Sequence, residues 1–259
     1  MAFVYGERGL EAPISSWEHR KVAIDRAFMH RDAALGEALL PSHTGNGDIA
    51  SAGTYDQIRA YSDWAAQPWV KTVCEVGFAT ASSTIVYLES NPHLRVVAFD
   101  LMTIPGNASQ QALAFVSARY GGHRITIVEG DSQRTLTEYQ RFYGELCDII
   151  SVDGAHDTRA YADFAKLRWY ANPTRHVLLA DDCVSRTVYE KVKLQRPNVM
   201  WFGGVWDSWR RIVDEEAQVR EKATYVYGGE DEPWIEPFSG CLKGWCEGEY
   251  AFVEVSQEY

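Results

Sequence analysis

The sequence has no apolar run that approaches the roughly 20 residues needed to span a membrane. It also contains no internal repeat and no low-complexity segment. The start of the chain, MAFVYGERGLEAP, lacks the basic first region of a signal peptide, and Glu7, Arg8 and two glycines interrupt the apolar stretch that would follow it. With 46% hydrophobic and 24% charged residues, the composition of the 259-residue chain is typical of a globular protein. We therefore expect a cytoplasmic protein that consists of one domain and an added segment.

Positive charge is scarce. The chain has 25 Lys and Arg residues against 36 Asp and Glu residues, which gives a formal net charge of −11. Such a charge repels phosphate backbones at long range and argues against nucleic acid as the main partner. We therefore expect a small-molecule partner, with no nucleic acid and no membrane, and the sequence leaves a homo-oligomer open.

Cysteine is also sparse, and its count is odd. The five cysteines are Cys74, Cys147, Cys183, Cys241 and Cys246. Three of them lie in or beside apolar runs that are typical of strands. The segment CLKGWC holds two cysteines, but no second pair and no nearby histidine completes a zinc site. We therefore expect free thiols in a reducing compartment and not a disulfide framework.

Strand and helix patterns alternate from residue 69 onward. The runs that predict strands are WVKTVCEVGF, RVVAFDL, RITIVEGD, CDIISVDG and HVLLADD, with NVMWFGGVW and EYAFVEVS further on. The runs that predict helices between them are ASSTIVYLES, SQQALAFVSARY, TLTEYQRFYGE and TRAYADFAKLRWY. The alternation predicts an α/β fold, with a Rossmann-like, doubly wound, mostly parallel seven-stranded sheet and helices on both of its faces.

Two further helices are predicted before the sheet, over residues 15–40 and 54–67. The segment between them, PSHTGNGDIASAG, has the composition of a loop. We expect residues 1–68 to form an N-terminal helical lid and residues 69–259 to form the main domain.

The first five predicted strands each end in acidic residues. In an open parallel sheet, ligands bind beyond the carboxyl ends of the strands, where loops and helix N-termini converge. The residues at these ends are Glu75 with Gly77, then Asp100, Asp131, Asp153 with His156, and Asp181 with Asp182. Random surface acids would not fall so regularly at one edge, so this edge is the candidate functional site.

The first strand leads into a helix through VCEVGFATASS, which holds one glycine where a dinucleotide-binding G-x-G-x-x-G turn holds three. Ala79 and Ala81 are small, but their Cβ atoms would crowd a pyrophosphate. A ligand without phosphates, such as S-adenosylmethionine, fits this turn better. Asp100, at the end of the second strand, is placed to accept hydrogen bonds from both ribose hydroxyls, although an NAD enzyme would use such an acid as well.

Four motifs at successive strand ends carry a family resemblance. EVGFATA resembles the first motif of class I S-adenosylmethionine-dependent methyltransferases, and IVEGDSQRTL resembles the adenine-binding strand end of the catechol O-methyltransferase group. IISVDGAH and VLLADDC resemble the two metal-bearing strand ends of the same group, and the likeness covers roughly residues 70–185. The resemblance implies an S-adenosyl-L-methionine cofactor. The residues that would bind it are Glu75, Gly77, Ala79, Asp100, Asp131, Ser132 and Gln133.

Some of these residues also have simpler interpretations. The resemblance implies that Ser132 and Gln133 contact adenine, but Asp131 and Ser132 are also residue types that cap helices. Glu75 could likewise cap the following helix. A capping role and a cofactor role are compatible with each other.

Asp153, Asp181 and Asp182 end two neighbouring predicted strands, which lie about 4.8 Å apart in a parallel sheet. Three carboxylates at such ends can converge on one cation, and oxygen ligands suit Mg²⁺ or another hard divalent cation better than zinc. The third ligand is often Asn in the group that the chain resembles, so Asp182 makes this site more negative. A surface cluster of acids without a metal is the alternative.

His156 follows the first of these acids by three residues, where the catechol group places a Lys as general base. Histidine titrates near neutrality, so His156 could take a proton from a hydroxyl group without a large pKa shift. The alternative is a capping or solvent-facing role at a helix start. Ala155 stands where the catechol enzymes have an aromatic residue that gates the acceptor, so a flat catechol is not implied.

The sequence therefore predicts an S-adenosylmethionine-dependent, divalent-metal-assisted O-methyltransferase that acts on a small molecule with vicinal oxygens. Three alternatives stay open. The first is a metal-independent methyltransferase of the same fold with an O, N or S acceptor, and the second is a non-catalytic S-adenosylmethionine-binding protein. The third is an NAD-dependent oxidoreductase. The aromatic residues Trp201, Phe202, Trp206 and Trp209 are expected mainly in the core or at an interface.

Overall fold

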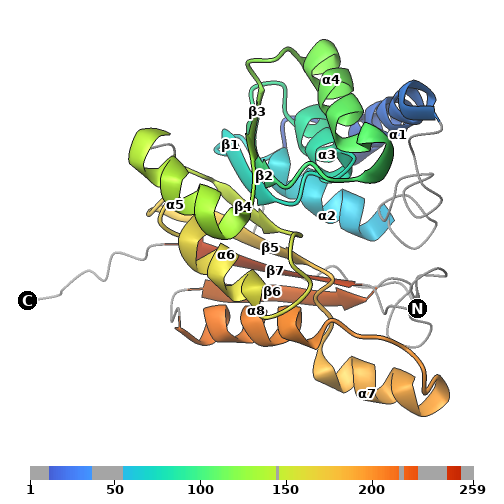
Figure 1. The fold of residues 1–259 in the computed structure, drawn as a ribbon, viewed down its shortest axis with the longest axis vertical. Coiled ribbons are helices and arrows are strands. Elements are labelled where there is room, and N and C mark those ends of the chain that lie inside the picture. The colour runs from blue at the N-terminus through green and yellow to red at the C-terminus, as the bar shows by residue number, and fades with distance from the viewer. Residues whose placement is uncertain (1–11, 37–54, 144–145, 216–218, 227–243, 252–259) are drawn as a thin grey trace, which may run out of the picture.

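The structure is a computed structural model of the chain, and it describes residues 12–36, 55–143, 146–215, 219–226 and 244–251. Its centre is a sheet of seven strands in the order β3-β2-β1-β4-β5-β7-β6 (Figure 1). The strands are β1 (Thr72–Val76), β2 (Arg95–Asp100), β3 (Ile125–Glu129), β4 (Ile149–Val152), β5 (Arg175–Asp181), β6 (Val219–Val226) and β7 (Gly244–Ala251). Strands β1 to β5 pair in parallel, and β7 runs antiparallel to both of its neighbours.

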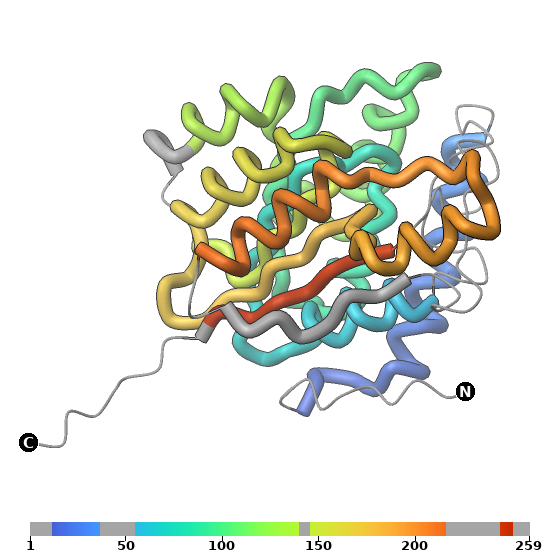
Figure 2. The backbone as a smooth tube through the Cα atoms, turned by 90° about the horizontal axis from the view of Figure 1, so that it is seen from below, coloured from blue at the N-terminus to red at the C-terminus, as the bar shows by residue number. Residues whose placement is uncertain are grey.

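Helices cover both faces of this sheet (Figures 1 and 2). The helices are α1 (Trp17–Leu35), α2 (Tyr55–Ala65), α3 (Ser82–Ser90), α4 (Ala108–Tyr120), α5 (Ser132–Tyr143), α6 (Arg159–Leu167), α7 (Arg186–Gln195) and α8 (Gly203–Glu215), with a short 3₁₀ turn, η2 (Pro105–Asn107), before α4. The predicted α/β fold, with a mostly parallel sheet covered on both sides, is confirmed. All five residues of β1 are buried, as expected for a central strand of such a sheet.

Two hydrophobic clusters, one on each face, hold the layers together. The first joins α1, α2, α3 and α4 to the sheet, and its buried side chains include Trp64, Tyr61 and Trp245. The second joins α5, α6 and α8 to the opposite face and includes Phe164 and Trp209. Because α1 and α2 share the first cluster with the sheet, the N-terminal helices pack as part of the same core.

The segment NVMWFGGVW does not form the predicted strand, because helix α8 begins at Gly203. The side chains of Val205, Trp209 and Ile212 recur three or four residues apart and are buried against the second cluster. This is the spacing of an amphipathic helix, and the run of aromatic and β-branched residues before it gave the wrong impression of a strand. Strand β6 forms where no strand was predicted, and β7 begins before the predicted segment EYAFVEVS.

The prediction of free thiols is wrong for four of the five cysteines. Cys74 is bonded to Cys147, and Cys183 is bonded to Cys246. Each bond joins a strand to a segment beside its neighbour, because Cys147 lies just before β4, the neighbour of β1, and Cys183 lies just after β5, the neighbour of β7. The pairings depend on this strand order and not on spacing along the chain, which is why the sequence did not reveal them. Cys241 lies outside the described residues.

Among the helices of the described segments, none combines the length and the apolar composition that a bilayer crossing requires.

Candidate active site

The carboxyl ends of the five parallel strands lie along one edge of the sheet, as the strand pairing requires. The six acidic residues predicted for this edge stand in or near these ends, together with the turn at Gly77 and the start of α6. The order of the strands puts the end of β1 between the ends of β2 and β4. The turn after β1 is therefore the centre of this edge.

Gly77 has a backbone conformation that only glycine adopts easily, with φ of +99°. A Cβ atom at this position would lie 2.2 Å from the carbonyl oxygen of Asp153. The turn after β1 therefore packs directly against the backbone at the end of β4. Ala79 and Ala81 follow with positive φ angles of 45° and 68°, so the whole turn is tightly wound.

Asp100 fastens this turn to the end of β2. Its Oδ2 accepts hydrogen bonds from the backbone N–H groups of Phe78 at 2.7 Å and Ala79 at 3.0 Å. Its Oδ1 accepts a hydrogen bond from the backbone N–H of Met102 at 2.5 Å. Each carboxylate oxygen has more than one acceptor direction, so these bonds are compatible with the predicted contacts to ribose hydroxyls.

Glu75 is buried inside β1, with 1% of its surface exposed. Its carboxylate accepts hydrogen bonds from the hydroxyl of Ser83 at 2.7 Å and from the hydroxyl of Thr84, both in the first turn of α3. Burial raises the pKa of Glu75 to about 7, although the two hydroxyl groups oppose the rise. Glu75 thus holds the start of α3 through side-chain hydroxyl groups and not through the backbone N–H groups that the capping interpretation implied, and its predicted contact with a cofactor stays a prediction.

Asp131, Ser132 and Gln133 lie where β3 leads into α5. The Oδ1 of Asp131 accepts a hydrogen bond from the backbone N–H of Gln133 at 2.9 Å, which is the predicted capping interaction. The side chain of Gln133 donates to Asp163 on α6 at 2.6 Å, and Lys166 donates to the Gln133 carbonyl. Burial raises the pKa of Asp163 to about 6.

Asp163 and Lys166 were not predicted from the sequence. Asp163 stands between Ala160, Phe164 and Leu167 on the buried face of α6. A carboxylate on an otherwise apolar helix face was the available signal, because such a residue needs a polar partner. That partner is Gln133, 30 positions earlier in the chain.

Asp153, His156 and Asp182 form one cluster. The Nε2 of His156 lies 3.5 Å from Oδ1 of Asp153 and 3.4 Å from Oδ2 of Asp182. One possible ligand atom from each of the three residues lies within 4.8 Å of the others. The ring of His156 also contacts Phe202, with ring centroids 4.5 Å apart. The cluster combines two carboxylates with one titratable imidazole.

The environment of this cluster is unfavourable for the negative charge of Asp153. The Asp153 side chain keeps 38% of its surface exposed, yet the surrounding protein desolvates the carboxylate enough to raise its pKa well above the ordinary value. The negative charges of Asp181 and Asp182 add to the rise, and His156 opposes it. A positive charge placed among these groups would therefore be stabilised.

Asp181 departs from the predicted carboxylate trio. Its Oδ1 accepts a hydrogen bond from the side chain of Gln57 on α2 at 2.9 Å, and another from the backbone N–H of Asp182 at 2.8 Å. Asp181 is the last residue of β5, whereas Asp182 follows the strand with a positive φ of 52° and its Oδ2 lies 3.4 Å from Nε2 of His156. In the described residues, the group close enough to share an ion is Asp153, His156 and Asp182.

Gln57 itself was not predicted. It is buried and also donates to the hydroxyl of Tyr61 at 3.0 Å, whose ring stacks on Tyr87. Burial raises the pKa of Tyr61 well above its ordinary value, so its hydroxyl stays protonated. No local pattern marked Gln57, because its contact with Asp181 spans 124 positions of the sequence.

The chain matches neither a protein-family model nor a curated protein sequence. Solved structures do match. The O-methyltransferase TomG of Streptomyces achromogenes, involved in tomaymycin synthesis and crystallised with S-adenosylmethionine, has a TM-score of 0.60 and 17% identity, covering 88% of this chain and 91% of that one. An O-methyltransferase of Bacillus cereus in complex with S-adenosylhomocysteine has a TM-score of 0.61 and 14% identity, with the same coverage. The chain shares the fold of these enzymes. At identities this low, the likeness extends to the fold alone.

Proposed function

We propose that the protein is an S-adenosylmethionine-dependent O-methyltransferase that acts on a small molecule. The observation that carries the proposal is the packing of the Gly77 turn against the backbone of Asp153. This contact puts a turn suited to the cofactor directly beside the cluster of Asp153, His156 and Asp182. A donor and an acceptor held at these two places would be neighbours, as transfer of a methyl group requires.

The proposed cofactor site lies along the ends of β1, β2 and β3. When bound, S-adenosylmethionine supplies a methyl group on a positively charged sulfur. Asp100 would accept hydrogen bonds from the ribose, and Ser132 and Gln133 would contact the adenine. The absence of further glycines in the turn supports a ligand without a pyrophosphate, because Ala79 and Ala81 carry Cβ atoms there.

The residues of the cluster also fit a hard divalent cation such as Mg²⁺. Two carboxylates face one another across His156, and the raised pKa of Asp153 reflects desolvation first and then the negative charges of Asp181 and Asp182, which a cation would neutralise. Asp153 and Asp182 would hold the ion, while Asp181, the third residue of the predicted trio, would support them from its bond to Gln57. When bound, such an ion lowers the pKa of a nearby hydroxyl group.

His156 is the proposed general base. Its Nε2 points toward both carboxylates, which would stabilise the imidazolium formed when His156 takes a proton from the acceptor hydroxyl. This arrangement also supports the runner-up mechanism, which is transfer without any metal. In that mechanism, the two carboxylates act on His156 alone.

The acceptor is proposed to carry two adjacent oxygens. Such a molecule would be oriented by both oxygens at an ion held by Asp153 and Asp182, whereas a single hydroxyl group would be oriented less well. Residues 1–68 are proposed to act as a lid over this acceptor. The bond between Gln57 of α2 and Asp181 supports the lid, because it ties the N-terminal helices to the reacting edge.

Calorimetry with S-adenosylhomocysteine tests the cofactor site. We expect saturable binding by the wild-type protein and a loss of about 2–4 kcal/mol in Asp100→Ala, because two hydrogen bonds from ribose to a charged acceptor are lost. Glu138→Gln, on the exposed surface of α5, is the matched control and should bind as the wild type does. Equal affinity in the wild type and Asp100→Ala would remove Asp100 from the site.

Chelation separates the two mechanisms. Methyl transfer from labelled S-adenosylmethionine is measured on matched diols and mono-ols, before and after treatment with EDTA. The metal-assisted mechanism predicts that diols react faster, that EDTA abolishes transfer, and that Mg²⁺ restores it while affinity for S-adenosylhomocysteine is unchanged. Full activity after exhaustive chelation would establish the metal-independent alternative.

A further inference from the structure

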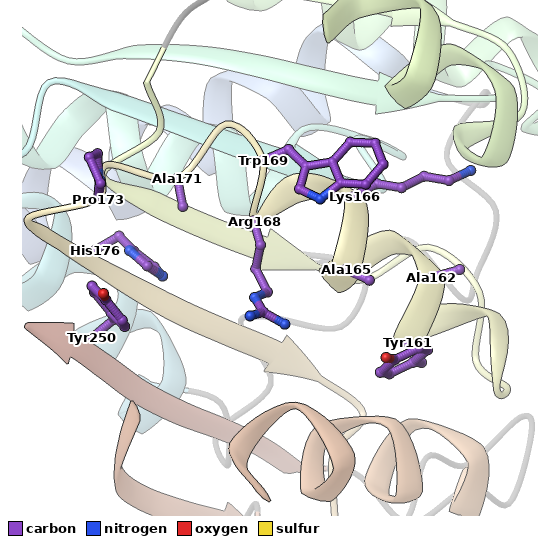
Figure 3. Close-up of a pocket in the computed structure, with 10 residues that line it drawn as sticks. All are labelled: Tyr161, Ala162, Ala165, Lys166, Arg168, Trp169, Ala171, Pro173, His176 and Tyr250. Atoms are coloured by element: carbon purple, nitrogen blue, oxygen red, sulfur yellow. The ribbon is translucent and has the colours of Figure 1, made fainter. Parts of the chain in front are cut away.

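A cavity lies at the opposite edge of the sheet from the candidate active site. It has a volume of about 840 Å³, within the range of small-molecule sites, and lies between the end of α6 and the strands β5 and β7 (Figure 3). His176 at the start of β5 lines it, whereas Asp181 ends the same strand. Five residues of strand separate the two by about 17 Å, so the cavity is separate from the acid and histidine cluster.

The walls of this cavity present flat aromatic surface. The rings of His176 and Tyr250 are stacked 4.7 Å apart, with an angle of 15° between their planes. Trp169 is 62% exposed, which makes it the most exposed tryptophan in the described part of the chain. Tyr161 lines the end of the cavity toward α8 (Figure 3). Such surfaces favour a planar, apolar ligand.

The cavity is also positive, in a protein whose net charge is −11. None of its 10 labelled lining residues is acidic, while Arg168 and Lys166 are basic; because Lys166 donates to the carbonyl of Gln133, the positive charge toward the strands comes from Arg168. Arg168 extends from the end of α6 toward the strands that carry His176 and Tyr250 (Figure 3). A local excess of positive charge on an acidic protein favours an anionic ligand.

His176 adds a specific polar requirement. It is 4% exposed, and its Nδ1 lies 2.9 Å from the carbonyl oxygen of Asn172, which can only accept a hydrogen bond. Nδ1 therefore carries the proton, and burial lowers the pKa of His176 and keeps the ring neutral. Nε2 is then an acceptor, and it is buried without a hydrogen-bond partner among the described residues.

We propose that this cavity binds a planar aromatic carboxylate that also carries a hydroxyl or N–H group. The carboxylate pairs with Arg168, the ring lies against Trp169 and the stacked pair of His176 and Tyr250, and the donor group satisfies Nε2 of His176. The assignment does not depend on the proposed methyltransferase activity, because none of these residues belongs to the candidate active site.

The test uses the full-length protein and 4-hydroxybenzoate as the probe in isothermal titration calorimetry. We expect saturable binding with a dissociation constant below about 1 mM, near the limit for weak specific ligands. Two matched probes each lack one feature: 4-hydroxybenzamide lacks the charge, and 4-methoxybenzoate lacks the donor. Each should bind at least about 10-fold more weakly, which corresponds to one lost polar contact.

Variants then locate the bound probe. Arg168→Gln and Trp169→Ala should each weaken binding of 4-hydroxybenzoate at least about 10-fold, and both side chains are exposed enough for the fold to tolerate the change. Arg134→Gln, on the surface of α5, and Met29→Ala, on the surface of α1, are the matched controls and should bind normally. Absence of saturable binding by the wild type, or normal binding by both Arg168→Gln and Trp169→Ala, would overturn the proposal.

Discussion

The two halves of the carboxyl edge use their acidic residues in opposite ways. In the first half, at the ends of β1 to β3, each carboxylate accepts hydrogen bonds from nearby backbone or hydroxyl groups. Asp100 holds the Gly77 turn, Glu75 holds α3, and Asp131 caps α5. In the second half, at the ends of β4 and β5, Asp153 and Asp182 face each other across His156.

The two halves differ in what the negative charges of their acidic residues interact with. Hydrogen bonds in the first half fix the shape of the edge, so its acids act as structural anchors for the turn and the helix starts. In the second half, desolvation and neighbouring negative charge raise the pKa of Asp153, so the cluster attracts protons and cations. Substitutions in the second half should therefore affect chemistry, and substitutions in the first half should affect stability and the shape of the turn.

The largest expected effect is on turnover, in the second half. His156→Ala should lower the rate of methyl transfer about 10²–10⁴-fold, because the general base is lost. The free energy of unfolding and the affinity for S-adenosylhomocysteine should stay close to wild type, since the His156 side chain is 39% exposed. Single-turnover assays and calorimetry measure the two quantities. His93→Ala, which changes an exposed histidine before β2, is the control. A His156→Ala variant as active as the wild type would show that the second half has no greater effect on chemistry than the first.

The second-largest expected effect is on the free energy of unfolding, at the Gly77 turn in the first half. Gly77→Ala should lower the free energy of unfolding by roughly 3–5 kcal/mol, because a Cβ atom would overlap the Asp153 carbonyl and the φ angle is unfavourable for alanine. Gly122→Ala is the matched control, since a Cβ atom there meets nothing within 4 Å. Urea unfolding of both variants checks the expectation. Equal stability of the two would show that the turn does not need to pack against Asp153.

A smaller expected effect is the pH dependence of stability that comes from the Glu75 carboxyl. The pKa of this carboxyl is about 7 in the folded protein, above the ordinary value of 4.5. The Glu75 carboxyl therefore ionises at a lower pH in the unfolded chain than in the folded protein. As the pH rises from about 4.5 to about 7, the unfolded state is stabilised by this ionisation and the free energy of unfolding falls. The loss reaches at most about 3 kcal/mol.

Glu75→Gln removes this titration. Its stability relative to wild type should therefore increase between pH 5 and pH 8, as measured by urea unfolding at each pH. Glu129→Gln, at the exposed end of β3, should show no such trend. A constant difference between Glu75→Gln and wild type across this pH range would show that Glu75 is ionised in the folded protein at pH 5.

The features that could be predicted from the sequence are those that depend on the pattern within a single segment. The strand runs that end in Asp100, Asp153 and Asp181 were predicted from local patterns, and so was the one-glycine turn at Gly77. The proximity of Asp153, Asp182 and His156 followed from the rule that parallel strands end at one edge. These features depend only on local periodicity and on the direction of the strands.

The remaining features depend on contacts between distant segments. The bond of Gln57 to Asp181 and the two disulfides required knowledge of which elements become neighbours. The predicted strand over NVMWFGGVW failed because aromatic residues suit both a strand and the buried face of a helix. The different partners of Asp181 and Asp182 required the exact end of β5, which patterns locate only within a few residues.

The antiparallel strand β7 bears on where segments of this protein can be exchanged for others. Because Val226 of β6 pairs with Gly244 of β7, and Asp181 pairs with Trp245, the chain leaves and re-enters the sheet at the reacting edge. The N-terminal helices give a second such pair of anchors, since Arg31 near the end of α1 bonds to Thr80 and Gln57 near the start of α2 bonds to Asp181. Sequence exchanged between Gly36 and Tyr55, or between Val226 and Gly244, leaves the pairings of the described strands in place. Under the proposed function, these two intervals are the places to build variants with new acceptor preferences.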